Sequence, residues 1–255
     1  MDNVSRYFET TQLPADLSRE LFAYLGSVDE RQQPNVSWHQ AKFMGHPRPR
    51  REAWFKRTPN SPGYRYSNTG TLPTSVMPAA LQERVFKWAE DCTGEKYNGM
   101  LVNEYPHSVD ATSRGYGSGS SNIAAHSDDE HKSYLSGTII SMSLGAPRTF
   151  RIREIATGVY TKMALVNGTV VLMKPGSQER FTHEIVKQTA AEKRSDPTQY
   201  RYNITIRPEC PCGLVRCLLS SRVKKPSRPI CEPAALEASK DETVPPRKKK
   251  QRRSE

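Results

Sequence analysis

Apolar residues recur at helical spacing in two segments of the first hundred residues. In Leu13–Leu25, Leu17 and Leu21 are followed by another apolar residue one turn further on, and a proline stands near the start. Pro78–Cys92 carries a similar stripe, its proline suits the first turn of a helix, and Gly94 follows its end. The pattern therefore predicts two amphipathic helices ahead of the remaining elements.

From residue 100 onward, the apolar residues gather in short β-rich runs separated by Gly, Pro and Asn turns. Many short strands with turn signals between them are typical of a sandwich or barrel, and the two helices would pack on one side of it. We therefore expect an α+β fold that is mainly β. The predicted strands are Met100–Tyr105, Thr138–Leu144, Thr149–Arg153, Gly168–Met173, Arg180–Val186 and Tyr200–Arg207.

Three further segments differ in composition from these elements. Gln33–Ser75 is polar and rich in proline, and its aromatic residues are interleaved with His, Lys and Arg. Ser113–Asn122 is Gly/Ser-rich and predicts a flexible surface loop, but no Lys-Ser or Lys-Thr pair follows its glycines, so it does not match a phosphate-binding P-loop. Beyond about Ser220 the chain gains Pro, Lys, Arg and Glu, which predicts a disordered tail.

The net charge of the 255-residue chain is +11. Ser221–Glu255 carries +6 of this charge and the preceding residues carry +5, so both parts are basic. A basic balance indicates a polyanionic partner such as nucleic acid, although many basic proteins bind none. No apolar run has the roughly 18 residues of a membrane span, and five cysteines, an odd number, favour a reducing compartment over a disulfide scaffold.

Two histidines and one aspartate form the most informative set of polar residues. His126 and Asp128 stand in a His-Ser-Asp sequence near a turn, and His183 lies in the β-rich run RFTHEI. A lone His-x-Asp is usually a surface histidine beside an acid. With the second histidine, the three side chains can occupy one face of an octahedron and leave three sites open, which suits non-haem Fe(II) with oxygen.

The last predicted strand has a polar face. Alternation along RYNITIR places Arg201, Asn203, Thr205 and Arg207 on one side and apolar residues on the other. Two arginines on a buried face need a polar ligand, and a guanidinium matches a carboxylate in a two-point fork. A sheet with one face in water would explain the same alternation without any ligand.

HSDDE, the later His183 and RYNITIR, in this order and preceded by Asn103-Glu104-Tyr105, resemble the AlkB family of Fe(II)/2-oxoglutarate dioxygenases. The pattern of that family is His-x-Asp, a distal His and a closing Arg-x-Asn-x-Thr-x-Arg strand. The resemblance spans about residues 35–210 and implies a double-stranded β-helix (jelly roll) with N-terminal helices. It places a dioxygenase domain at 1–209, with a nucleotide-recognition lid at 35–75 and a jelly-roll core at 100–209. Residues 210–255 remain as a basic, proline-rich tail.

The resemblance also implies the cofactors Fe(II), 2-oxoglutarate and O₂. His126, Asp128 and His183 would be the catalytic iron ligands, and Arg207 would pair with the distal carboxylate of 2-oxoglutarate. The reaction of the family is oxidative dealkylation, which hydroxylates the carbon attached to a base nitrogen and releases formaldehyde. The other residues implied to line the 2-oxoglutarate site are Asn103, Tyr105, Arg201, Asn203 and Thr205.

Within the family, HSDDE is similar to the sequence of the DNA-repair members, whose extra acids face the damaged base. These acids would be Asp129 and Glu130. YRYSNTG resembles the aromatic strand of their lid, in which Tyr66 would stack on an extruded base, with Tyr64 and Ser67 nearby. The basic lid residues that could hold phosphates include Arg50 and Arg51.

We therefore expect a monomeric enzyme that demethylates 1-methyladenine or 3-methylcytosine in DNA. An RNA demethylase of the same fold and a non-catalytic nucleic-acid-binding module stay open, although a pure binder needs neither iron ligands nor an anion site. The run Pro245–Arg253 reads as a nuclear localisation signal or a DNA tether, and we expect no membrane association. Cys210, Cys212, Cys217 and Cys231 fit no common zinc-finger spacing.

Overall fold

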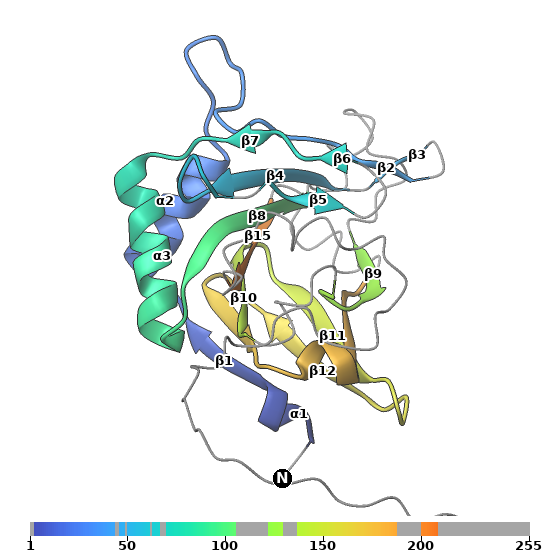
Figure 1. Cartoon of the computed structure of the whole chain (residues 1–255). Helices are drawn as coiled ribbons and strands as arrows, with labels where there is room; N and C mark the ends of the chain where they lie inside the picture. The colour runs from blue at the N-terminus through green and yellow to red at the C-terminus, as the bar shows by residue number, and fades with distance from the viewer. Residues whose placement is uncertain are drawn as a thin grey trace, which may run out of the picture. The chain divides into compact units, whose positions relative to one another are not determined.

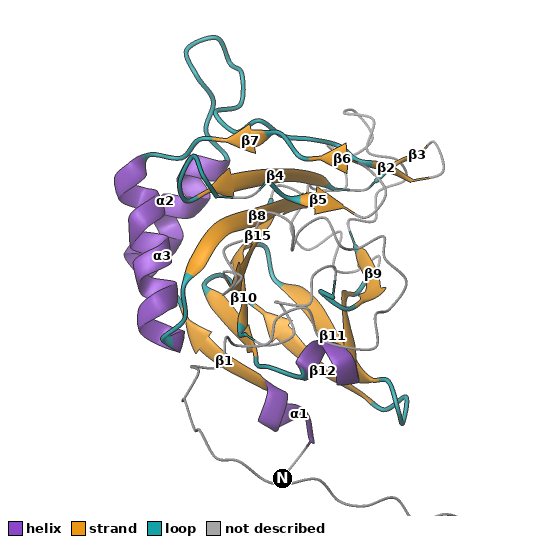
Figure 2. Ribbon diagram, in the orientation of Figure 1, coloured by secondary structure: helices purple, strands orange, loops and turns teal. Residues whose placement is uncertain are grey.

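The structure, a computed structural model, describes residues 3–43, 46–48, 50–61, 63–66, 70–105, 122–129, 137–187 and 200–208. All of these residues belong to the unit Met1–Arg222. The strands form a seven-stranded sheet and a four-stranded sheet, here called the major and the minor sheet (Figures 1 and 2). Every pairing in them is antiparallel except that of β4 with β7.

The major sheet has the strand order β1-β13-β10-β15-β8-β4-β7, and the minor sheet has the order β12-β11-β14-β9. The strands of the major sheet are β1 (Phe8–Gln12), β4 (Arg51–Lys56), β7 (Thr74–Ser75), β8 (Tyr97–Tyr105), β10 (Ile139–Gly145), β13 (Thr169–Met173) and β15 (Arg201–Pro208). The strands of the minor sheet are β9 (Ile123–His126), β11 (Arg148–Glu154), β12 (Tyr160–Leu165) and β14 (Phe181–Ile185). Two short hairpins join β2 (Lys42–Phe43) to β3 (His46–Pro47) and β5 (Arg65–Tyr66) to β6 (Gly70–Thr71).

Two helices cover the outer face of the major sheet (Figure 2). They are α2 (Ala15–Leu25) and α3 (Ala79–Thr93), and their buried residues join the apolar side chains of that face in one cluster. Gly94 ends α3 in a left-handed conformation and donates its N–H to the Glu90 carbonyl. Both helices predicted from the sequence are confirmed, because an apolar stripe at helical spacing must be buried against another layer. The short helices are α1 (Asn3–Tyr7) and α6 (Ser177–Arg180).

A second apolar cluster joins the two sheets across the interior. It combines side chains of the major sheet, such as Ile139 and Val171, with side chains of the minor sheet, such as Phe150 and Phe181. Burial of both inner faces holds the two sheets together and confirms the predicted jelly-roll class. The remaining inner surface of the major sheet is polar, and this polar surface forms part of the site described below.

A third, smaller cluster lies around Trp54 of β4, and contains Tyr64, Leu72 and Leu101. The Trp54 ring lies so close to Gly99 of β8 that a Cβ atom at Gly99 would clash with it. The glycine therefore provides space for the indole ring above β8.

The β-rich runs predicted after residue 100 all correspond to strands, within a few residues at each end. The local pattern did not predict β1, β9 and β12, which are polar or carry little alternation. It also missed β4, which lies in the segment predicted as a lid and pairs with β8 in the major sheet. These strands form because pairing partners exist in the fold, which a local pattern does not reveal.

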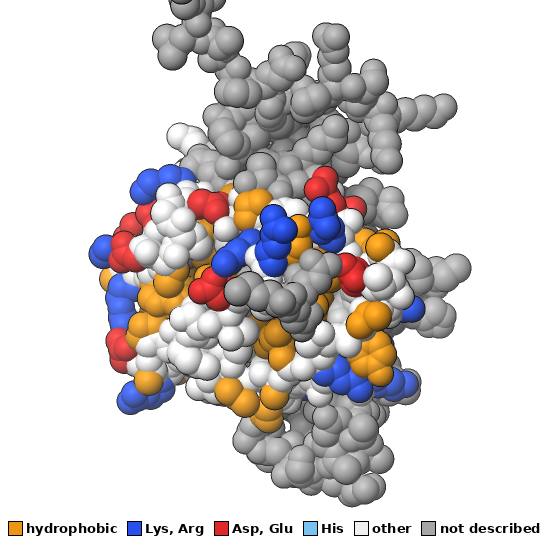
Figure 3. Space-filling view, turned by 90° about the horizontal axis from the view of Figure 1, so that it is seen from below, with side chains coloured by type: hydrophobic (Ala, Val, Ile, Leu, Met, Phe, Trp, Pro, Cys, Tyr) orange, Lys and Arg blue, Asp and Glu red, His pale blue; other side chains and the backbone are white. Residues whose placement is uncertain are grey.

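No helix of the described segments is long and apolar enough to span a bilayer. The face in Figure 3 shows Lys and Arg side chains placed among Asp, Glu and apolar ones. The described Lys and Arg side chains of this face therefore do not form one continuous basic patch.

Candidate metal centre and the polar face beside it

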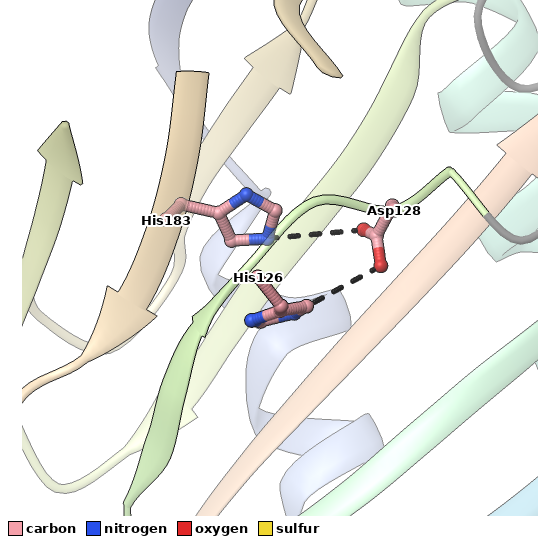
Figure 4. Close-up of side chains that lie close together, drawn as sticks. All are labelled: His126, Asp128 and His183. Atoms are coloured by element: carbon pink, nitrogen blue, oxygen red, sulfur yellow. Dashed lines mark ion pairs between the residues drawn. The ribbon is translucent and has the colours of Figure 1, made fainter. Parts of the chain in front are cut away.

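Two neighbouring strands of the minor sheet bring His126, Asp128 and His183 together. His126 ends β9 and stands directly opposite His183 of β14, and Asp128 follows two residues after His126. The Nε2 atom of His126 lies 4.0 Å from Oδ1 of Asp128, and the Nε2 atom of His183 lies 3.9 Å from Oδ2. One ligand atom from each residue lies within 4.8 Å of the others (Figure 4).

Hydrogen bonds beside the cluster orient His126 and Asp128. The Nδ1 atom of His126 lies 2.9 Å from the Ala124 carbonyl. A carbonyl only accepts, so Nδ1 carries the proton and Nε2 presents a lone pair toward Asp128 and His183. The backbone N–H of Asp128 donates to Oε1 of Gln178 over 2.8 Å, which fixes the turn that carries the carboxylate.

Burial and neighbouring charges set the protonation of the cluster. Burial lowers the pKa of His183 to about 3, and the adjacent His126 adds to this effect. Burial alone would raise the pKa of Asp128, but Arg207 and the two imidazoles outweigh it and lower this pKa to about 2. At neutral pH the cluster therefore offers a neutral imidazole and a carboxylate, the forms that bind a metal. Two imidazole nitrogens and one carboxylate suit Fe(II) with open coordination positions.

Arg207 reaches the cluster from the major sheet. Its Nη2 atom lies 2.6 Å from Oδ1 of Asp128, and both side chains are almost fully buried. The guanidinium also lies over the Tyr64 ring, 5.1 Å from its centroid. The sequence predicts Arg207 at the carboxylate of 2-oxoglutarate far from the metal, and in the structure its guanidinium lies against Asp128 of the cluster. The arginine lies at the metal end because its strand position aims it at Asp128.

The inner face of β15 is polar along its length. Asn203 donates from Nδ2 to the Ser141 hydroxyl and to the Met142 carbonyl, both over 2.9 Å. The Thr205 hydroxyl donates to Oδ1 of Asn203 over 3.4 Å. The predicted alternation of this strand is therefore confirmed, but the whole strand is buried and neither face is in water.

Arg201 lies at the other end of β15 from Arg207 and is only 1% exposed. Its Nη2 atom donates to the Ser143 hydroxyl over 3.1 Å, and its guanidinium carbon lies 4.7 Å from the centroid of the Tyr105 ring. Nε and Nη1 of Arg201 have no hydrogen-bond partner among the described residues. Burial lowers the pKa of this guanidinium. A buried cation with unsatisfied donors is costly unless an anion compensates it, so Arg201 is suited to bind a carboxylate.

The two lid arginines, predicted to hold phosphates, make ion pairs within the protein. Arg50 is buried and bonds Asn103 and Glu52. Arg51 makes a two-point pair with Glu104 through both its Nε and its Nη2. Acids at these positions neutralise both guanidinium groups, and the sequence analysis had given Glu52 and Glu104 no role.

The other predicted substrate residues fall into two groups. Tyr64, predicted to lie near the base, is buried against Trp54 with ring centroids 5.2 Å apart, and it lies beneath the Arg207 guanidinium. Asp129 is exposed next to Asp128. The side chain of Tyr66 and the whole of Ser67 and Glu130 lie outside the described residues. The same holds for residues 113–121 of the predicted loop and for the tail with its four cysteines.

The 2OG-Fe(II) oxygenase superfamily model matches residues 10–207 of the chain. "Alpha-ketoglutarate-dependent dioxygenase alkB homolog 3" of Rattus norvegicus is 28% identical over 228 residues, which cover 80% of this chain and 68% of that protein. "DNA oxidative demethylase ALKBH2" of Mus musculus is 24% identical over 185 residues, covering 69% and 68%. The "RNA replication protein" of Grapevine virus A is 32% identical over 140 residues, covering 55% and 7%. With the His-Asp-His cluster in place, the chain belongs to the 2OG-Fe(II) oxygenase superfamily, as an AlkB-type dioxygenase that uses Fe(II), 2-oxoglutarate and O₂.

Proposed function

We propose that this protein repairs DNA by oxidative demethylation of small N-alkyl lesions such as 1-methyladenine and 3-methylcytosine. The cluster of His126, Asp128 and His183 carries the proposal, because its donor set suits Fe(II). One relative, whose match covers 69% of this chain, is named a DNA oxidative demethylase, and this name supports DNA as the substrate.

The three cluster residues would hold Fe(II). When bound with 2-oxoglutarate and O₂, Fe(II) would supply oxidising power for hydroxylation of the alkyl carbon, with 2-oxoglutarate decarboxylated to succinate. The hydroxylated product then loses formaldehyde and the base is restored. Asp128 stays ionised for this role because Arg207 and the imidazoles hold its pKa low. The protein itself supplies positions and a site shielded from water.

The two arginines of β15 would hold opposite ends of 2-oxoglutarate. Arg201 is assigned to the distal carboxylate, since it is buried with unsatisfied donors beside Tyr105. Arg207, bound to Asp128, is assigned to the end of the molecule nearest the metal. Asn103, Asn203 and Thr205 face the same interior and would complete the site.

The lesion would enter beside the metal as an extruded base. Tyr66 would stack on it, Ser67 would lie nearby, and Asp129 and Glu130 would meet its polar edge. A base stacked on an aromatic ring recovers part of the cost of leaving the duplex. The basic run Pro245–Arg253 would serve as a nuclear signal or as a tether that raises the local concentration of DNA.

RNA demethylation is the second candidate, and a specific observation favours it. The viral relative is named an RNA replication protein. Its matched region is 32% identical to this chain, whereas the matched region of the DNA demethylase is 24% identical. Stacking and phosphate contacts can serve both polymers, so the substrate must be measured.

The test is formaldehyde release from matched DNA and RNA oligonucleotides that each carry one 1-methyladenine or 3-methylcytosine. Protein purified without oxygen is loaded with Fe(II) and assayed with and without 2-oxoglutarate, and His183→Ala serves as the metal-site control. We expect release that requires 2-oxoglutarate, is faster on DNA and is lost in the variant. Faster release from RNA would favour the second candidate. Turnover of 2-oxoglutarate with neither polymer repaired would refute both substrates.

A further inference from the structure

Arg50 directly precedes β4 and connects two buried polar residues. Its Nε atom donates to Oδ1 of Asn103 over 3.0 Å, and its Nη2 atom lies 3.0 Å from Oε1 of Glu52. Glu52 is completely buried and stands directly opposite Asn103 in the pairing of β4 with β8. These three residues form a continuous chain of charge-assisted contacts on the inner face of the major sheet.

The contact with Arg50 determines which way the amide of Asn103 points. A guanidinium only donates, so the atom of Asn103 that faces it must be the oxygen. The amide NH₂ is then the group that Asn103 can offer elsewhere, and it can donate but not accept. Because Glu52 holds the guanidinium in place, the amide cannot flip without losing a charge-assisted hydrogen bond in a buried setting.

The neighbouring asparagine on β15 is arranged differently. Asn203 stands opposite Asn103, and the NH₂ of Asn203 is bound by Ser141 and the Met142 carbonyl. Asn203 therefore directs its NH₂ into the sheet. None of the hydrogen bonds of the described residues uses the NH₂ of Asn103, which leaves this donor for a ligand with acceptor oxygens, such as a carboxylate.

We propose that Arg50 is a positioning residue for 2-oxoglutarate, which acts by holding Asn103 with its NH₂ toward a carboxylate of the co-substrate. The inference rests on the proposed function, in which Asn103 lines the 2-oxoglutarate site. Glu52 contributes because it holds the Arg50 guanidinium in place. Arg50, predicted in the lid, would thus act on 2-oxoglutarate binding through Asn103.

The experiment measures direct binding of 2-oxoglutarate by calorimetry to the full chain loaded with Mn(II), which replaces Fe(II) without turnover. Arg50→Met and Asn103→Ala are each expected to raise the Kd for 2-oxoglutarate about tenfold, the effect of losing one charge-assisted hydrogen bond. The double variant should bind no more weakly than Asn103→Ala, since Arg50 acts through the asparagine. Mn(II) affinity should be unchanged in all three, because the substitutions leave His126, Asp128 and His183 in place.

The matched control is Arg51→Met, which breaks the ion pair that the adjacent arginine makes with Glu104 of β8. It should leave the Kd for 2-oxoglutarate unchanged. Asn103→Asp tests the orientation separately, because it keeps an acceptor for Arg50 but replaces the donor with a negative charge. We expect it to bind 2-oxoglutarate more weakly than Asn103→Ala. If Arg50→Met does not fold, Glu52→Gln loosens the same arginine and should raise the Kd in the same direction.

Several outcomes would overturn the inference. If the Kd of the double variant for 2-oxoglutarate were a further tenfold higher than that of Asn103→Ala, Arg50 would act independently of the asparagine. If Arg50→Met and Arg51→Met lost the same affinity for 2-oxoglutarate, the effect would be a general structural one. Normal binding by Asn103→Asp would show that the NH₂ is not used. Wild-type protein that binds Mn(II) but not 2-oxoglutarate would instead contradict the proposed function.

Discussion

Replacing Arg207 with methionine should destabilise the protein strongly, because it leaves the buried carboxylate of Asp128 without its nearest cation. The two side chains are 4% and 5% exposed, and Nη2 and Oδ1 are 2.6 Å apart. Removing one partner of a buried ion pair typically costs about 3–5 kcal/mol, since the other charge stays buried. In a domain of this size each kcal/mol lowers Tm by about 2–4 °C, so we expect a loss of roughly 6–20 °C.

Urea unfolding of the metal-free protein measures the effect as a double-mutant cycle. Arg207→Met, Asp128→Asn and the double variant are compared with the wild type at neutral pH. The double variant should be more stable than Arg207→Met, because the neutral amide no longer needs a cation. Added Mn(II) should narrow the Tm gap between Arg207→Met and the wild type, since the metal replaces the missing positive charge. A loss below about 1 kcal/mol, or strictly additive effects, would refute the argument.

Two other predictions follow from the same structure. Arg201→Lys should raise the Kd for 2-oxoglutarate about tenfold, because a point charge replaces the two-point guanidinium contact beside Tyr105. Calorimetry on Mn(II)-loaded protein measures this Kd, and an unchanged value would mean that Arg201 does not bind 2-oxoglutarate. Burial alone would raise the pKa of Glu90, but Arg57 and Lys96 outweigh it and lower this pKa from 4.5. The ionised Glu90 therefore stabilises the fold above pH 4.5, and this stabilisation is lost as the pH falls further. Glu90→Gln should lower the free energy of unfolding by about 1 kcal/mol at pH 7, and the difference from the wild type should shrink when urea unfolding is repeated at acid pH.

The chemical identity of the metal site could be predicted from the sequence because it depends on residue types. His-x-Asp followed by a histidine in a β-rich run supplies two imidazoles and one carboxylate, and the three side chains meet as expected. The polar face of β15 was predictable for a similar reason, since alternation along a strand follows from backbone geometry alone. Neither inference required knowledge of which strands are neighbours.

The partners of the arginines could not be predicted in this way. Arg50 and Arg51 look like surface cations in a basic, aromatic segment, but β4 joins the major sheet and brings them to Asn103 and Glu104. Arg201 and Arg207 are equivalent in the sequence pattern. Their roles differ because opposite ends of β15 meet different neighbours, Tyr105 at one end and Asp128 at the other.

The sequence by itself determined the donor set for the metal, the two amphipathic helices and the alternating strand with its two arginines. These features depend on residue chemistry and on local backbone periodicity, which are present before the chain folds. Only the tertiary structure decided that β1 and β4 belong to the major sheet, which arginine neutralises Asp128 and which arginine holds Asn103. Those outcomes depend on contacts between residues far apart in the chain, and pairing across strands rather than local pattern selects them.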